Sequence, residues 1–505
     1  MKRENKLDNR ISFLTALIAF ICVYGIFFND SWACDHVGNY YGLGKWAWGI
    51  KGYVPVTLAG GRFGAFIWDT LSFLFAQIGI SKLQHEWVLQ AVFMVLLALA
   101  AKTIYSIFEK YFDIQYKPII VTLIICLTFI NPLFVENVVY VGYELGASIL
   151  CSAIAAKLFT NKTVKSSILA VPLLFISIIT YQAHISLFLV WTTAYIYLEY
   201  GKKISRKAVI ELVRSYVIAL VPLIADMAVM KIFAAYSQRG DDLATGESAS
   251  LIKSIVRVWY HLYVTEIDLT VRCFVLLFTV VLVGLGFVVF AKERRVGRIG
   301  EIAYLVAVFA VLNCYYVAIV FVGYASFYGR VFWPGFAAIS MMCLLGLNLC
   351  QKSLVEKVYL YIAGVFFIGL FFFTQTECSD CYIANKLDEE IAGIVEDYIQ
   401  HYEAETGNSI ETINVKLLDD FERYQKYLIR NSKYEFAYKM LTQETLPVDV
   451  INYVYSENYD KKKMSDEDYE KYFSDIAGNE ALEVTDFNPA QQLVFEGDTL
   501  YWVVY

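Results

Sequence analysis

The chain lacks the glycine-rich loops that bind nucleotide phosphates, since neither a Walker-type sequence nor a GxGxxG sequence occurs in its 505 residues. It also has few metal ligands at a useful spacing. Residues 29–64 contain no DxD motif, and no histidine or second CxxC motif lies at zinc spacing from Cys378 and Cys381. These absences exclude the common nucleotide-binding enzymes, leave no required cofactor, and disfavour a divalent metal ion.

Charged residues are also scarce over most of the chain. Apolar residues make up 58% of the sequence, the mean hydropathy is +0.51, and uncharged runs of about 20 residues recur, as in polytopic membrane proteins. Residues 1–374 hold 31 Lys and Arg against 21 Asp and Glu, whereas residues 375–505 hold 11 against 28. We therefore predict an all-α membrane domain at 1–374 and a small acidic α/β domain at 375–505.

Eleven segments are apolar enough to be membrane-spanning helices. They are residues 11–28, 87–107, 118–134, 138–159, 166–180, 183–199, 208–232, 270–291, 302–322, 332–350 and 355–374. The uncharged run 166–198 is too long for one span, so we predict two helices joined by a tight turn at YQAH, residues 181–184.

Lysines and arginines in short loops orient the spans, because such loops stay on the cytoplasmic side. The cationic loops of this chain share one side only if residues 62–80 do not cross the membrane. We predict that 62–80, and likewise 251–266, are helices in the outer interface. The N-terminus is then cytoplasmic, and residues 29–86 and the C-terminal domain lie outside the plasma membrane.

The loop at 29–64 is acidic, aromatic and rich in glycine, and it ends on Gly60, Gly61 and Arg62. The glycines allow the backbone to approach a ligand closely, and the arginine guanidinium can bind two phosphate oxygens at once. This segment is therefore a candidate phosphate-binding site. Arg330 follows Gly329 at the outer mouth of a span and has the same chemistry. For both arginines the alternative is an anchor that reaches the lipid headgroups.

Several short motifs resemble those of the GtrII-type membrane glucosyltransferases, a family with the GT-C architecture. They are CDHVGNYYGLGKWAW and GGRFG in the first outer loop, NPLFVENVVYVGYE at 131–144, TYQAHISLFL at 180–189, and YGRVFWP at 328–334. The resemblance implies an enzyme that takes a hexose from a polyprenyl phosphate and places it on an extracytoplasmic glycan.

The resemblance also implies a catalytic base in the first outer loop. Asp35 aligns with the acidic position of the family and is our first candidate for deprotonating the acceptor hydroxyl. The family prefers two adjacent acids followed by an arginine, whereas Cys34 precedes Asp35 here. Asp30 therefore stays a competitor, and the phosphate is left to Arg62 and Arg330. A loop-capping role is the alternative for Asp35.

Acidic residues inside the membrane must face a cavity or a partner, because an unpaired charge in lipid is costly. Glu144 and Asp226 each lie about 9 Å from the outer end of their predicted helix, at a depth where they would line a sugar pocket. The alternative for Asp226 is a pairing with Lys231 or with a neighbouring helix. Glu136 lies at the boundary, as an acceptor-binding group or as a solvated acid of a turn.

The YQAH turn provides three more polar candidates. Tyr181 and Gln182 are predicted to bind the phosphate or donor, and His184 is predicted to bind sugar. A structural role is the alternative for the histidine. The match to the family motif favours Gln182 in particular.

The C-terminal domain contains no catalytic constellation. We expect a helix at 383–405 ending at Gly407, a strand at 413–418, a helix at 419–430, a helix starting at Ser465 in a capping box, and a hairpin at 491–505 turning at Gly497. Cys378 and Cys381 form CSDC and leave a disulfide open, whereas seven of the ten cysteines lie in or beside apolar spans as small hydrophobes.

The predicted partners are a lipid-linked sugar donor and a cell-surface glycan acceptor. A flippase and a donor-synthesising glycosyltransferase would supply the donor, and nucleic acid is excluded for so acidic a domain. One alternative is a polysaccharide polymerase or ligase that uses polyprenyl-diphosphate glycans. Another is a flippase or transporter of lipid-linked sugars, although the sequence shows no convincing internal repeat.

Overall fold

The computed structural model describes residues 2–28, 58, 64, 67, 86–140, 142–200, 205–233, 269–293, 299–314, 333–417, 446–455, 457–477 and 487–504. The chain divides into two compact units, and it passes from the main part of the first into the second between Gln375 and Thr376. Helix α19, Glu356–Thr406, runs through this point without a break.

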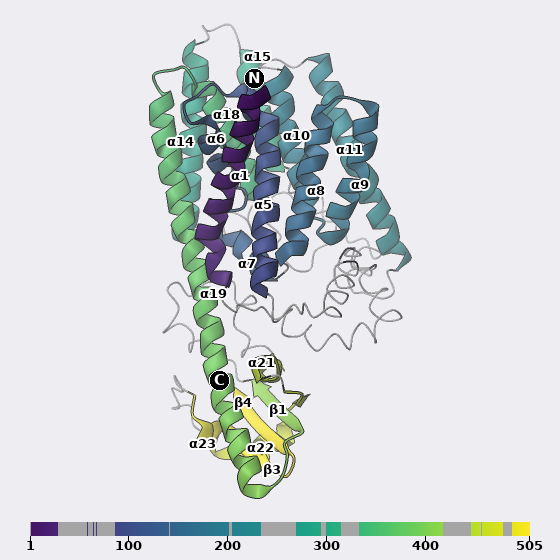
Figure 1. Ribbon diagram of the computed structural model, residues 1–505, viewed down its shortest axis with the longest axis vertical. Coiled ribbons are helices and arrows are strands. Elements are labelled where there is room, and N and C mark those ends of the chain that lie inside the picture. The colour runs from purple at the N-terminus through teal and green to yellow at the C-terminus, as the bar shows by residue number, and fades with distance from the viewer. Residues whose placement is uncertain are drawn as a thin grey trace. The chain divides into compact units, whose positions relative to one another are not determined.

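The described part of the first unit is helical throughout. Its elements are α1 (Lys2–Tyr24), η1 (Gly25–Phe28), α5 (Glu86–Phe108), η2 (Glu109–Tyr111), α6 (Lys117–Cys126), α7 (Pro132–Tyr140), α8 (Gly142–Thr160), α9 (Val164–Thr180), α10 (His184–Tyr200), α11 (Arg206–Ile232), α14 (Leu269–Glu293), α15 (Ile299–Cys314), α18 (Gly335–Cys350) and the start of α19. Most of them run side by side, with the short α7 at one end of the bundle (Figure 1). Helix α8 packs against α5, α9 and α10, and α10 also contacts α11 and α18.

Among the described helices, five are long and apolar enough to cross a membrane. They are Lys6–Phe28, Trp87–Tyr111, Arg206–Ile232, Leu269–Ala291 and Glu356–Thr406. Helices α7 and α8 together would make a sixth. These helices confirm the class of helical membrane protein, whereas the number of eleven spans stays a prediction. The predicted interfacial helices at 62–80 and 251–266 lie outside the described residues, apart from Gly64 and Ile67.

The predicted spans 118–134 and 138–159 are wrong in their bounds. Helix α6 ends at Cys126, and NPLFVEN is largely the helix α7 rather than a turn. Pro132 opens α7, because proline needs no hydrogen-bonded N–H in a first helical turn. Gly142 then has a φ of +47°, which favours glycine, and the helices on its two sides are bent by 120°.

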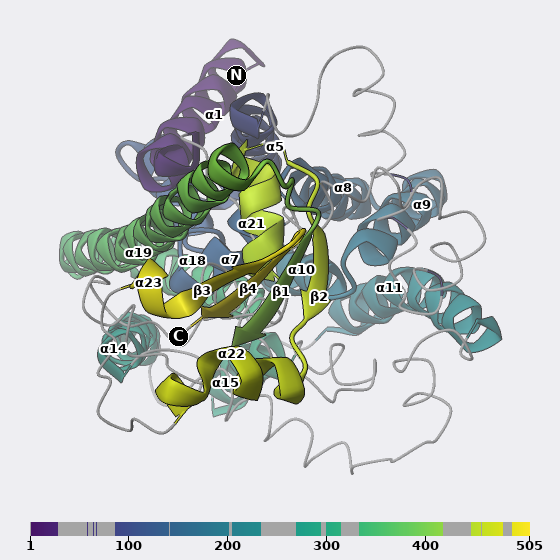
Figure 2. The same ribbon diagram turned by 90° about the horizontal axis from the view of Figure 1, so that it is seen from below.

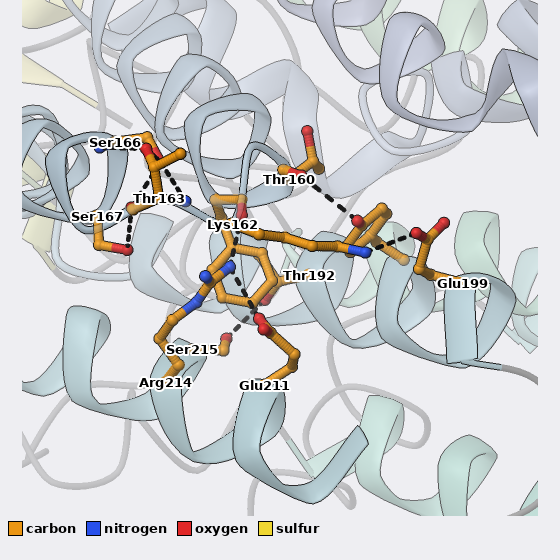
Figure 3. Close-up of polar contacts among 12 residues, drawn as sticks. Thr160, Lys162, Thr163, Ser166, Ser167, Thr192, Glu199, Glu211, Arg214 and Ser215 are labelled. Carbon is orange, nitrogen blue, oxygen red and sulfur yellow. Dashed lines mark hydrogen bonds and ion pairs between the residues drawn. The ribbon is translucent and has the colours of Figure 1, made fainter. Parts of the chain in front are cut away.

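The predicted turn between two helices at YQAH is confirmed. Helix α9 ends at Thr180, Tyr181 is extended, and α10 begins at His184. The opposite end of α9 begins in a capping box, in which Thr163 and Ser166 each accept from the other's backbone N–H (Figure 3). A short turn on each side of α9 thus makes α9 antiparallel to both α8 and α10. The start of α8 and the start of α10 therefore lie at the same end of the bundle.

The second unit contains a four-stranded sheet in the order β2-β1-β4-β3. Its strands are β1 (Thr412–Leu417), β2 (Asp460–Lys463), β3 (Leu493–Glu496) and β4 (Thr499–Val504), joined by α21 (Leu446–Tyr455), α22 (Asp466–Ala477) and α23 (Pro489–Gln492). Figure 2 shows α22 on one side of the sheet, with α21 and the end of α19 on the other. Strand β1 is parallel to β2 and β4, and β3 is antiparallel to β4. Met464, Phe473 and Val503 form a core beneath α22.

The structure confirms the predicted strand near 413–418, the hairpin turning at Gly497, and a helix capped by Ser465. The capping box is only half formed, because the Asp468 carboxylate accepts from the Ser465 hydroxyl instead of from its backbone N–H. Lys416 donates to Asp466 over 2.8 Å, and this hydrogen bond and the lysine charge lower the pKa of the exposed carboxyl.

Two further helices were predicted for this unit, at 383–405 and at 419–430. The predicted helix 383–405 is only the end of α19, so its start is wrong. Residues 378–388 continue the helix because Cys378, Cys381, Asn385 and Asp388 are buried at helical spacing. Both cysteines are free thiols. The predicted helix 419–430 lies outside the described residues.

Candidate functional site

Gly64, the last residue of the GGRFG motif, packs directly on the end of α9. A Cβ atom at this buried position would lie 2.6 Å from Thr180 Oγ1 and 2.8 Å from both the Cα and the N of Thr180. Only glycine fits so close to a neighbouring backbone. The GGRFG and TYQAH motifs, more than 100 residues apart in the sequence, therefore meet at this end of the bundle.

The turn after Thr180 directs an amide side chain towards α11. Gln182 Nε2 donates to Asp226 Oδ2 over 2.9 Å and lies 3.2 Å from Met230 Sδ. Asp226 is 2% exposed and lies about 9 Å from the end of α11, as predicted. Among the described residues Asp226 makes no ion pair with Lys231, but the other form of the alternative, a pairing with a neighbouring part of the bundle, is present, because Gln182 in the turn between α9 and α10 is its hydrogen-bond partner. The structure thus brings two predicted site residues together.

His184 is fully buried at the start of α10. Its Nδ1 is hydrogen-bonded to Ser148 Oγ of α8, and its ring lies 5.3 Å from that of Tyr181 and 5.7 Å from that of Trp333, centroid to centroid. Trp333 in turn packs edge-on against Phe134 of α7, at 4.7 Å. The YGRVFWP and NPLFVEN motifs therefore join the same cluster through Trp333 and Phe134.

The two remaining described acids are buried but sit differently from the prediction. Glu144 is 6% exposed and lies in the first turn of α8, so its predicted depth of about 9 Å is wrong. The error arises because the helix starts at Gly142 rather than at 138. Glu136 is 5% exposed in the middle of α7, and the solvated turn acid considered for it is therefore wrong. Both residues have interaction partners.

Four motifs quoted for the family resemblance thus converge on one end of the first unit. A family model described as glucosyl transferase GtrII matches residues 50–349, more than half of the chain. The chain belongs to the GtrII glucosyl transferase family. Comparisons with curated proteins and with solved structures found no match. Membership of the GtrII family, together with the long apolar helices, identifies a membrane glucosyltransferase.

Four predicted site residues of this GtrII protein lie outside the described residues: Asp30, Asp35, Arg62 and Arg330. Their roles stay predictions. Within the described ranges, no group of three or more His, Cys, Asp or Glu side chains is arranged to hold a metal ion.

Sequence reasoning missed the serines behind His184. Ser148 and Ser152 of α8 are both fully buried, and each is hydrogen-bonded to Ser177 of α9. They lie four residues apart and so share one helix face, which was the available signal. Serines in an apolar helix are otherwise indistinguishable from ordinary small packing residues.

Proposed function

We propose that this protein is a GT-C-type glucosyltransferase that transfers a hexose from a polyprenyl phosphate to a cell-surface glycan outside the plasma membrane. The N-terminus would be cytoplasmic, and the converging motifs and the second unit would be extracytoplasmic. A donor-synthesising glycosyltransferase and a flippase would deliver the donor. No resident cofactor is assigned to the reaction.

The observation that carries this proposal is the contact of Gly64 with Thr180. It joins the motif that contains Arg62 to the turn that contains Gln182. Arg62 is two residues from Gly64, a separation that extended chain covers in about 7 Å. The sugar attached to a phosphate bound by Arg62 would therefore lie near the Gln182–Asp226 pair. A sugar phosphate has a phosphate group that Arg62 would bind and hydroxyl groups that the Gln182–Asp226 pair would bind.

The other polar groups at this end of the bundle support a sugar-binding role. Asp226 is buried in an apolar helix, and among the described residues it receives one hydrogen bond, from the Gln182 amide. A carboxylate accepts several hydrogen bonds, and leaving them unmade in an apolar surrounding is costly. Sugar hydroxyls would donate to its free lone pairs. Arg330, three residues before Trp333, is the second phosphate candidate.

The proposed reaction is a single displacement. The acceptor hydroxyl oxygen attacks the anomeric carbon while Asp35 takes its proton. The bond between the anomeric carbon and the phosphate oxygen breaks, and polyprenyl phosphate leaves with the electron pair, its charge held by Arg62 and Arg330. The anomeric centre is inverted.

Complementation of a deletion strain tests this proposal. Mass spectrometry of the surface glycans should show a hexose that is lost in the deletion strain and restored by the wild-type protein. Asp35→Asn should not restore it, although the protein reaches the membrane in normal amount, because an amide cannot take the proton. Asp30→Asn is the matched control and should restore the hexose.

Two outcomes would contradict the proposal. Full restoration by Asp35→Asn together with failure of Asp30→Asn would move the base to Asp30. Identical surface glycans in the deletion and wild-type strains would reject the glycan acceptor. Purified wild-type protein given polyprenyl-phosphate glucose should also release polyprenyl phosphate when the wild-type glycan acceptor is added.

A further inference from the structure

The imidazole of His184 is held by a chain of buried serines. Ser148 Oγ contacts His184 Nδ1 and also lies 3.1 Å from the carbonyl oxygen of Ser177 and 3.3 Å from its hydroxyl. Ser152 completes the chain, with its hydroxyl 2.7 Å from that of Ser177. All four side chains are fully buried. The serines come from α8 and α9, so three helices together fix the orientation of the ring.

This arrangement leaves one ring nitrogen available. His184 Nε2 is buried and has no hydrogen-bond partner in the described part of the chain, and the same holds for Nε1 of the neighbouring Trp333. Buried polar atoms are nearly always paired, so two such atoms on adjoining rings point to a polar group that binds there. The two rings are 5.7 Å apart between centroids, with an interplanar angle of 73°.

The chemistry of the two rings indicates what that group is. Ser148 engages Nδ1 in either neutral tautomer, so Nε2 either accepts or donates a hydrogen bond. A hydroxyl group matches both cases, because it can donate and accept. A phosphate would require a donating nitrogen. The indole beside it offers an apolar face and an N–H donor, a combination suited to a sugar ring.

We propose that His184 Nε2 binds a hydroxyl group of the donor's hexose and that Ser148 is a positioning residue that keeps this nitrogen directed at the sugar. The inference rests on the proposed function, since it assumes a lipid-linked hexose donor. The donor's single hexose is assigned here, rather than the acceptor, because the site is closed in by α8, α10 and Trp333. A long glycan must remain open to water.

The test compares two lipids that differ only in the sugar. The affinities of the purified full-length protein for polyprenyl-phosphate glucose and for polyprenyl phosphate are measured by calorimetry in detergent. Ser148→Ala should weaken binding of the glucosylated lipid about tenfold, as expected for one hydrogen bond to a buried ring. Its binding of polyprenyl phosphate should stay within about twofold. Ser340→Ala is the matched control, because Ser340 is an equally buried serine that lies outside this chain of serines and donates to the carbonyl oxygen of Ile124.

Two histidine variants separate the ring nitrogens. Glutamine reaches the position of Nε2, whereas asparagine reaches only that of Nδ1. His184→Gln should therefore retain most of the preference for the glucosylated lipid, and His184→Asn should lose it even though it can still bond Ser148. This pattern would not follow from a structural role, for which asparagine is the better replacement.

Two results would overturn the inference. One is an equal loss of affinity for both lipids in Ser148→Ala and His184→Asn, which would mean that the histidine only supports the fold. The other is unchanged affinity for the glucosylated lipid in these variants. Wild-type protein that binds neither lipid would instead reject the proposed donor, and the inference with it.

Discussion

Substituting Gly64 by alanine tests whether the contact between the GGRFG and TYQAH motifs is needed for activity. The added Cβ would lie 2.6–2.8 Å from three atoms of Thr180, two of which belong to the backbone. Ordinary carbon contacts are about 3.5–4.0 Å, so one segment must move by about 1 Å. A displacement of about 1 Å in a substrate-positioning group costs about 100-fold in rate.

We therefore expect Gly64→Ala to lower the transfer rate about 100-fold while the protein stays folded. The overpacking itself should cost about 1–3 kcal/mol of unfolding free energy. The rate is measured with polyprenyl-phosphate glucose and the wild-type glycan acceptor, and the folded fraction by thermal unfolding in detergent. Removing the Thr180 hydroxyl in the double variant Gly64→Ala/Thr180→Val should restore little of the transfer rate, because the two backbone contacts remain.

A matched control is available in the same unit. Gly284 lies in α14, and a Cβ there would meet no heavy atom of the described residues within 4 Å. Gly284→Ala should therefore keep the wild-type rate. The reasoning would be refuted if Gly64→Ala kept at least half of the wild-type rate, or if its loss of rate only matched a loss of folded protein.

Two other predictions concern stability. Glu199→Gln should lower the unfolding free energy by about 1 kcal/mol, because Glu199 receives hydrogen bonds of 2.6 Å from both Lys110 and Lys162. Figure 3 shows the contact with Lys162. A melting temperature equal to that of the wild type in low salt would contradict this prediction. Ser465→Ala should cost about 1 kcal/mol through loss of the N-cap of α22, seen as faster hydrogen exchange of the Asp468 amide. Exchange should stay slow in Ser474→Ala, which alters an exposed position of the same helix.

The sequence was sufficient for features that depend on composition and length. The turn at 181–183 follows from an uncharged run that is too long for one span, and the hairpin at Gly497 follows from its alternating strands. The break at Gly142 was missed because it depends on backbone torsion, and hydropathy continues smoothly across it. The continuity of α19 was missed because polar residues at 377–388 resemble a linker, although their buried members recur at helical spacing.

The candidate site was only partly predictable. Gln182 and Asp226 were each selected for their chemistry, but their pairing joins residues 44 positions apart and needed the packing of α9, α10 and α11. The packing of Gly64 on Thr180 depends on tertiary structure in the same way. Ser148 carried no chemical signal of its own. Its role emerges only from the contact with His184.

The distribution of charge at this end of the bundle argues for one orientation of the proposed donor. Glu136, Glu144 and Asp226 are all buried here, and a phosphate placed among them would be repelled in a surrounding that screens charge poorly. The sugar hydroxyls, which can donate hydrogen bonds, suit the carboxylates instead. The hexose would then face α7, α8 and α11, and the phosphate would lie towards the two arginine motifs. The bond between the anomeric carbon and the phosphate oxygen would then lie between the buried acids and the two arginine motifs. Asp35, the proposed base, would have to reach this position from the first outer loop.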